Sequence, residues 1–479
     1  MLLRCSFIGL VVSYCSIKPL HAADEDLRLR LTEREDKRRP VEPWSTLVAG
    51  RPLTASGGLE INLESLQRRG LSNGSDQRNR LLSQQNLEAE AFYSFGGAFS
   101  IFAQFRAQKD KDYVAGAPDE TTKPFLERGE MWLSSQGIAG SRINLDLGRL
   151  HFEDDRRWWW DEDLDAIRFT YEQPRFEIAV AVARELAPNR TARYVVAPEH
   201  DGIIRLIGEM SWDFRPNHAL NLFLLHHRDR SRSEQFGQLT PREREDLSDG
   251  TLTWLGARVT GAFDFPPNAV IGYWFDTAWV RGRERTAYYQ EISPQLSAVN
   301  QISDRIVRGN GFDLGVTLRL PVAREPRLYA GYALGSGDRP RDTVDHSFRQ
   351  SGIQANEPGF GGVRRFPQYG VLLQPELSNL KILTLGAGLS LLRSSSLDLV
   401  YHRYRLAELA QSLRTAKLDA VLTGGHHDVG TELDLILALE EWKRVEVELS
   451  AGTFRAGRAF GDGEGRRSYR GFFSVRIAF

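Results

Sequence analysis

Carboxylates and tryptophans gather in one short stretch of this chain, HFEDDRRWWWDEDLDAIRF, at residues 151–169. Two acidic clusters, 153–155 and 161–163, flank three consecutive tryptophans. A carboxylate pair could serve a glycosidase, but that chemistry needs two groups at a defined separation in a cleft. Clustered acids in a polar connection are more often solvated charge. For the three tryptophans, the sequence favours either an anchor at the membrane interface or packing within a loop. A platform on which sugar rings stack is less favoured.

Histidine, the most common metal ligand, occurs twice as an adjacent pair, His226-His227 and His426-His427. Neighbouring residues of a strand point to opposite faces, so neither pair can chelate one metal ion. We therefore expect no metal site. Because the clustered acids indicate solvated charge rather than a catalytic pair, we also expect no enzymatic activity and no cofactor.

Arginine is the side chain best suited to bind an acidic ligand here. A guanidinium group keeps its charge at any relevant pH and matches a carboxylate with two parallel hydrogen bonds. Whether the arginines can act together depends on the elements that carry them.

The composition excludes several classes of protein. Charged residues make up 26% of the chain but the net charge is only −1, which argues against a nucleic acid partner. Beyond the N-terminus no apolar run reaches the ~18 residues that a membrane-spanning helix needs. A membrane β-barrel remains compatible, because its strands are apolar on one face only.

Period-2 alternation of apolar and polar residues recurs along the chain. Clear examples are LEINL at 59–63, FEIAVAV at 176–182 and TELDLILAL at 431–439. Many such segments predict an all-β protein whose sheet has one apolar face.

The connections between these segments alternate between short and long. Tight turns such as Gly96-Gly97 and Pro174-Arg175 are followed by long polar links such as 283–309 and 337–378. The alternation gives about 18 strands, with short periplasmic turns, long extracellular loops and both termini in the periplasm. The last strand alternates and ends in Phe479, as outer-membrane assembly requires. We predict a single transmembrane antiparallel β-barrel over residues 51–479.

The N-terminus has the features of a secretory signal. Residues 1–23 combine Arg4, an apolar run and a small-residue end, and both cysteines, Cys5 and Cys15, lie within them. The mature chain would then contain no disulfide. Residues 24–50 are expected to form a charged periplasmic segment. The predicted location is the Gram-negative outer membrane, in contact with its lipid and lipopolysaccharide.

Alternation also assigns arginines to the inner face of the barrel. Arg149 breaks the alternation after Gly148, and a β-bulge there would turn it inward. Acids such as Glu446 and Glu448 share the inner face, so any one arginine could instead belong to an Arg–Glu ladder that supports the barrel wall. Besides Arg149, the strand residues predicted to line the pore are Arg128, Arg168, Arg258, Arg319, Arg470 and Arg476.

An ordered set of stretches resembles the bacterial alginate export family. They are LGRLHFEDDRRWWWDEDLDAIRF, GTLTWLGARV, YAGYALGSGD, FRQSGIQANEPGFGGVRRF, PELSNLKILTLGAG, LDLVYHRY and DVGTELDLIL. The resemblance implies a monomeric barrel that exports an acidic exopolysaccharide, with an arginine-rich constriction and loops that occlude the pore at both ends. Arg364 and Arg365 lie in one matching stretch, so we expect them to fold inward and line the constriction rather than sit on a solvated loop.

One stretch departs from the family's pattern. VEVELSAGTF, at residues 445–454, carries two inward glutamates where the resemblance leads one to expect basic residues. The resemblance therefore supports polysaccharide export more strongly than alginate itself. The predicted function is passive export of an anionic exopolysaccharide, alginate or a related polyuronate, with periplasmic export proteins as partners. The alternative is a substrate-selective porin for uptake of small anionic solutes.

Overall fold

The computed structural model describes residues 43–479, with gaps at 72–78, 115–119, 122–123, 199, 230, 232–234, 247, 267–268, 294, 340–342, 361–362, 364 and 419. The predicted signal peptide and most of the predicted periplasmic segment lie outside the described residues. No helix in the described part is long and apolar enough to cross a membrane.

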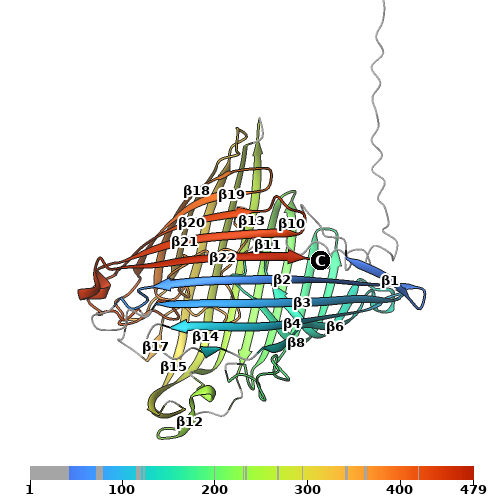
Figure 1. Cartoon of the computed structure of the whole chain (residues 1–479). Helices are drawn as coiled ribbons and strands as arrows, with labels where there is room; N and C mark the ends of the chain where they lie inside the picture. Colours follow the sequence, from blue (N-terminus) through green and yellow to red (C-terminus); the bar gives the residue numbers. More distant parts are fainter. Residues whose placement is uncertain are drawn as a thin grey trace, which may run out of the picture.

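Eighteen strands form the wall of a barrel (Figure 1). Four short strands pair at its margins, and three 3-10 turns lie between strands. The wall strands are β2(Arg51–Gln67), β3(Arg80–Gly96), β4(Phe99–Val114), β6(Phe125–Ser135), β7(Ile143–Glu153), β8(Asp161–Gln173), β9(Phe176–Ala183), β10(Ile204–Arg215), β11(His218–Arg228), β13(Ser248–Phe265), β14(Ala269–Ser293), β15(Leu296–Arg319), β16(Arg327–Gly335), β18(Leu380–Ser390), β19(Ser396–Leu406), β20(Asp428–Leu439), β21(Val445–Ala456) and β22(Arg467–Ala478). The marginal elements are β1(Trp44–Val48), β5(Glu120–Thr121), β12(Leu239–Pro241), β17(Val344–Asp345), η1(Ile138–Gly140), η2(Arg242–Arg244) and η3(Arg458–Gly463).

The barrel closes between its first and last wall strands. β2 pairs antiparallel with β22 from Gly58↔Ala478 to Gln67↔Tyr469, and the two lie side by side in Figure 1. The other wall strands also pair antiparallel with their neighbours in the chain. Closure leaves no edge strand in the wall, and the predicted fold class is confirmed.

The outer face of the wall is apolar. On β9 the side chains of Ile178, Val180 and Val182 are exposed, whereas Ala181 and Ala183 are buried on the opposite face. An exposed apolar band with a polar interior is the reverse of a soluble sheet packed on a core, and it matches a wall that faces lipid.

The tight turns occur where the sequence predicts them. Gly96 and Gly97 connect β3 to β4 with φ angles of 83° and 65°, a conformation that glycine adopts readily. The predicted long link at 283–309 is wrong. β14 and β15 continue to Ser293 and Leu296, because polar residues on both faces of the projecting hairpin obscure its period-2 pattern.

Two connections fold into the barrel and fill part of its interior. One is residues 154–160, between β7 and β8, and the other is residues 343–379, between β16 and β18. Together we call them the plug. Phe348, Leu372 and Leu377 of the longer connection are almost completely buried. The hydrophobic core of this protein therefore lies between the plug and the inner wall.

Candidate functional site

Asp154 stabilises the turn at residues 154–160, which we call the tryptophan turn. Its Oδ2 accepts the backbone N–H groups of Trp159 (2.7 Å) and Trp160 (3.0 Å), and its Oδ1 accepts the N–H of Arg156 (3.1 Å). Short acidic side chains commonly cap turns in this way. The acids of this stretch are thus not merely solvated charge, because Asp154 is buried and organises the backbone.

The three tryptophans pack inside the barrel. Each ring is 2% exposed, and Trp159 stacks on Phe223 of β11 with 4.8 Å between ring centroids. A Cβ at Gly256 of β13 would collide with the Trp159 ring, so glycine makes room for it. The loop-packing interpretation is confirmed, while the membrane-interface anchor is wrong. Rings this buried cannot stack on a sugar either.

Arg258 of β13 lies beneath the tryptophan turn. Its guanidinium group binds Asp154 (Nη1–Oδ1, 2.5 Å) and Asp276 of β14 (Nε–Oδ1, 2.5 Å), and the residue is 1% exposed. Arg258 does point inward, but its prediction as a pore-lining residue is wrong because the plug covers it. Alternation assigns a residue to a face and cannot reveal which loop folds over that face.

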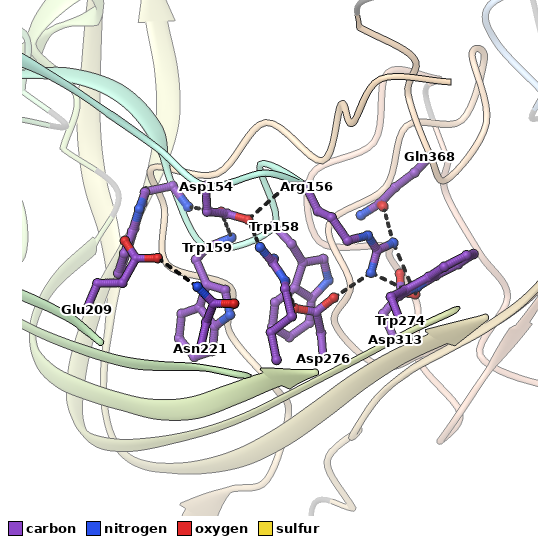
Figure 2. Close-up of polar contacts among 12 residues, drawn as sticks. Asp154, Arg156, Trp158, Trp159, Glu209, Asn221, Trp274, Asp276, Asp313 and Gln368 are labelled. Carbon is purple, nitrogen blue, oxygen red and sulfur yellow. Dashed lines mark hydrogen bonds and ion pairs between the residues drawn. The ribbon is translucent and has the colours of Figure 1, made fainter. Parts of the chain in front are cut away.

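Arg156 connects both parts of the plug to the wall (Figure 2). It binds Asp276, lies 3.4 Å from Asp313 of β15, and donates to Gln368 Oε1 (2.8 Å). Its guanidinium also lies over the ring of Trp274 at 4.5 Å. The shorter and longer plug segments are therefore fixed by the same cation.

Tyr369 makes a second connection. Trp158 Nε1 donates to the Tyr369 hydroxyl (2.8 Å), which donates to Asp313 Oδ2 (2.8 Å). Burial and the nearby Asp313 charge raise the pKa of Tyr369 well above its usual value, so the hydroxyl remains a neutral donor. The hydrogen bonds run from one plug segment through the other to the wall.

Wall carboxylates hold the far side of the plug. Glu432 of β20 accepts the N–H groups of Leu372 (2.6 Å) and Leu373 (3.1 Å). The hydroxyl of Tyr404 on β19 also donates to Glu432 (3.1 Å). Backbone groups of an inward loop need partners away from water, and these inward acids supply them. Some predicted inward acids thus support the plug rather than face the pore.

A charged cluster faces the lumen beside the plug. Arg365 is partly exposed and binds Asp161 Oδ2 (2.5 Å), with Glu357 at 3.8 Å. Burial raises the pKa of Glu357, while the cationic Arg365, Arg157 and Lys417 oppose that rise. Arg365 is therefore accessible to solvent, and its role in the constriction stays a prediction. Arg364 lies outside the described residues.

Two more cations pair with a wall carboxylate near this cluster. Glu64 of β2 binds both Lys417, from the β19–β20 connection, and Arg470 of β22 (2.5 Å). The Arg470 side chain is largely buried in this pair. Arg476 lies opposite Glu446 and Glu60 in the strand register, as a ladder arrangement requires.

Arg168 and Arg319 remain on the open inner face. Arg168 of β8 pairs with Asp146 of β7 (2.8 Å) and lines a cavity of about 250 Å³. Arg319 is exposed at the periplasmic end of β15 and has no ion-pair partner in the described part of the chain. Both positions fit the prediction that these residues line the pore.

Arg128 does not face the pore. The β4–β6 register shifts between Ala103 and Phe105, so Arg128 lies opposite Phe105, whose side chain is on the outer face. Arg128 donates to both oxygens of Asp165 (2.9 and 2.9 Å). The prediction failed because this bulge adds one residue to β6 and thereby reverses the faces that simple alternation assigns.

Arg149 is buried in the same neighbourhood. Its Nη1 lies 3.9 Å from both Asp165 and Glu185. The β7–β8 register runs through Gly148 without a shift, so the expected bulge is absent from that pair of strands. Arg149 therefore stabilises the extracellular ends of β7, β8 and β9 and does not line the pore.

Sequence reasoning missed His151, Glu357 and Lys417 as members of the charged region beside the plug, together with the buried Arg157. A signal was present in EDDRR, where three acids are followed directly by two arginines. Glu357 and Lys417 come from two long connections, and local patterns cannot predict that the charge of one acts on the other.

Asp246, in the β12–β13 connection, provides a pH test of the external loops. Burial, with Asp249 and Asp229 nearby, raises its pKa from 3.8 to about 7. The folded loop then holds a proton more tightly than the unfolded loop, so its stability falls as pH rises from 3.8 to about 7. We expect amide exchange at residues 248–252, corrected for intrinsic rates, to lose protection between about pH 4 and pH 7.

The matched control for this test is Asp246→Asn, because the asparagine side chain does not titrate. Its protection should fall less over the same pH range, because only Asp249, whose pKa burial also raises, still titrates nearby. Equal loss of protection in the variant and the natural protein would show that another group controls the loop.

A closed eighteen-stranded barrel with an apolar exterior and an inward-folded plug defines an outer-membrane channel. The chain matches the Alginate export family over residues 53–474 and belongs to that family. The family that the sequence resemblance indicated is thus confirmed.

Curated relatives agree with this assignment. The chain is 27% identical over 376 residues to the alginate production protein AlgE of Pseudomonas aeruginosa, covering 74% of each chain. It is 23% identical over 392 residues to the AlgE of Pseudomonas syringae pv. tomato, covering 74% of this chain and 76% of that one.

Solved barrels support the fold alone. OccAB1 of Acinetobacter baumannii has a TM-score of 0.52 at 9% identity, covering 89% of this chain and 97% of its own. OccK8 (OprE) of Pseudomonas aeruginosa has a TM-score of 0.52 at 11% identity, covering 89% and 98%.

Proposed function

We propose that this channel exports alginate or a closely related polyuronate from the periplasm by passive diffusion. Family membership supports the class of cargo. The observation that carries the proposal is the position of Arg365: its side chain is 45% exposed in the lumen and shares two carboxylate neighbours. It can bind a passing uronate without first being uncovered.

The pairing of Arg365 also explains how the polymer could keep moving. Exposed ion pairs contribute only ~0–1 kcal/mol, so a uronate carboxylate can replace Glu357 at Arg365 at little cost. Arg168, paired with Asp146, and the exposed Arg319 offer comparable sites on the wall. Each site attracts the polymer weakly and releases it again, as passage through a channel requires.

The closed wall favours a monomer, because it leaves no strand edge for another copy to pair with. We propose that periplasmic export proteins deliver the polymer to the periplasmic end, where Arg319 lies. Residues 1–23 are proposed to direct secretion and to be removed.

The test is planar-bilayer conductance with polyuronate added on the periplasmic side. We expect the polymer to reduce the current, and Arg365→Ala to require several-fold more polymer for the same reduction. Arg393→Ala, an arginine in the short β18–β19 turn, is the matched control and should behave like the natural protein. Adding Arg364→Ala to Arg365→Ala tests whether Arg364 contributes.

Two results would contradict this proposal. A cation-selective current that polyuronate leaves unchanged would exclude an anionic polymer. Equal reduction by a monomeric uronate and by the polymer, at equal uronate concentration, would favour the alternative of small-anion uptake.

A further inference from the structure

Three potential metal ligands converge where β7 and β8 adjoin the shorter plug segment. His151 Nε2 lies 3.3 Å from Glu153 Oε2 and 3.4 Å from Asp161 Oδ1. One donor atom from each residue lies within 4.8 Å of the other two. Ligands bound at about 2.0–2.1 Å in a zinc tetrahedron lie about 3.3–3.4 Å apart. Two of the three ligand separations thus already have the size of a zinc site.

The remaining polar atom of each side chain is occupied by another residue. His151 Nδ1 lies 2.8 Å from Asp163. Arg157 binds the other Glu153 oxygen, Oε1, at 2.5 Å, and Arg365 binds the other Asp161 oxygen, Oδ2, at 2.5 Å. These contacts leave His151 Nε2, Glu153 Oε2 and Asp161 Oδ1 directed at one another. Outer partners of this kind fix the tautomer of a ligating histidine and the orientation of ligating carboxylates.

One of the three donor atoms is buried without a hydrogen bond. Asp161 Oδ1 has no hydrogen-bond partner in the described part of the chain, and the Asp161 side chain is only 3% exposed. Burial of a carboxylate oxygen without a hydrogen bond is unfavourable, and a bound cation would remove that cost.

The cluster remains accessible from the lumen. The side chains of His151 and Glu153 are 29% and 33% exposed, and both line the cavity that also contains Arg168. An ion could enter from this cavity. A fourth ligand, either water or a carboxylate oxygen, could approach from the same side.

We propose that His151, Glu153 and Asp161 bind a divalent transition-metal ion, with Zn²⁺ as the best match to one imidazole and two carboxylates. This site does not depend on the identity of the exported polymer. The competing account is that His151 is an imidazolium paired with both carboxylates, which would give similar distances without any metal.

The experiment uses untagged full-length barrel in detergent, freed of metal by a chelator. Zn²⁺ binding is measured by calorimetry, and Co²⁺ binding by visible absorption, which reports ligand geometry. We expect one ion per chain in the natural protein. His151→Gln and Asp161→Asn should weaken binding at least ten-fold, and the outer-partner variant Asp163→Asn by about 10–100-fold.

Asp246→Asn is the control for metal bound elsewhere, because Asp229, Asp246 and Asp249 form another group of carboxylates in the described chain. Heat-modifiable gel migration shows that each variant is a folded barrel. Absence of stoichiometric binding by the natural protein would support the imidazolium account and overturn the proposal. Binding that survives His151→Gln and Asp161→Asn would also overturn it.

Discussion

Arg258→Met is expected to destabilise the barrel by about 3–5 kcal/mol, because removal of one partner leaves a buried charge uncompensated. Arg258 lies between the carboxylates of Asp154 and Asp276, and all three residues are buried. Arg156 still binds Asp276 in the variant. Asp154 would lose its strongest partner, and the 154–160 turn should detach from the wall.

The measurements are the midpoint of thermal unfolding in detergent and the tryptophan emission maximum. Detachment of the turn would expose Trp158, Trp159 and Trp160 to water and shift emission to longer wavelength. Adding Asp154→Asn should restore part of the stability, since asparagine keeps an oxygen for the Trp159 and Trp160 N–H groups without a charge.

Arg319→Met is the matched control, the same substitution at an exposed inner-face arginine. It should change stability by less than about 0.5 kcal/mol, as surface substitutions usually do. If Arg258→Met is as stable as Arg319→Met, the buried ion pairs do not hold the plug.

Removal of the longer plug segment is expected to increase single-channel conductance several-fold and to abolish the reduction of current by polyuronate. The reason is that barrels of 16–18 strands otherwise enclose an aqueous channel. The structure permits the deletion: Asn379 N–H donates to Ser336 O (3.1 Å), so the ends of the connection are adjacent. A Gly-Ser linker can replace residues 339–377.

The control shortens the projecting β14–β15 hairpin instead. Thr286 lies opposite Ser303 in the register, so an Asn-Gly turn can replace residues 287–302. This variant should keep the natural conductance, because the removed residues pair with each other and with β12 rather than with the plug. Unchanged conductance after plug removal would mean that residues 343–379 do not narrow the lumen.

The strand pattern predicted the inner face correctly where the ladder is regular. Arg168, Arg319 and Arg470 all lie on the inner face, because each belongs to a stretch of strand that has no register shift. Arg128 failed because one extra residue in β6 reverses the face. A bulge depends on the pairing of two strands, so one strand's sequence cannot reveal it.

The tryptophan stretch shows a different limit of sequence reasoning. Trp158 bonds to Tyr369 and stacks near Phe348, which are about 200 positions away in the chain. Local composition indicates only that three large apolar rings are expected to be buried. It contains no information about which distant connection buries them.

The sequence alone determined the architecture and the family. Period-2 alternation, turn spacing and the terminal aromatic strand are local signals. Within a membrane, strands of this pattern are stable only as a closed barrel, because every backbone group must be paired. The tertiary structure alone decided which charges can meet a polymer. Arg258 and Arg365 look alike in the sequence, yet the plug buries the first between two carboxylates and leaves the second partly exposed in the lumen.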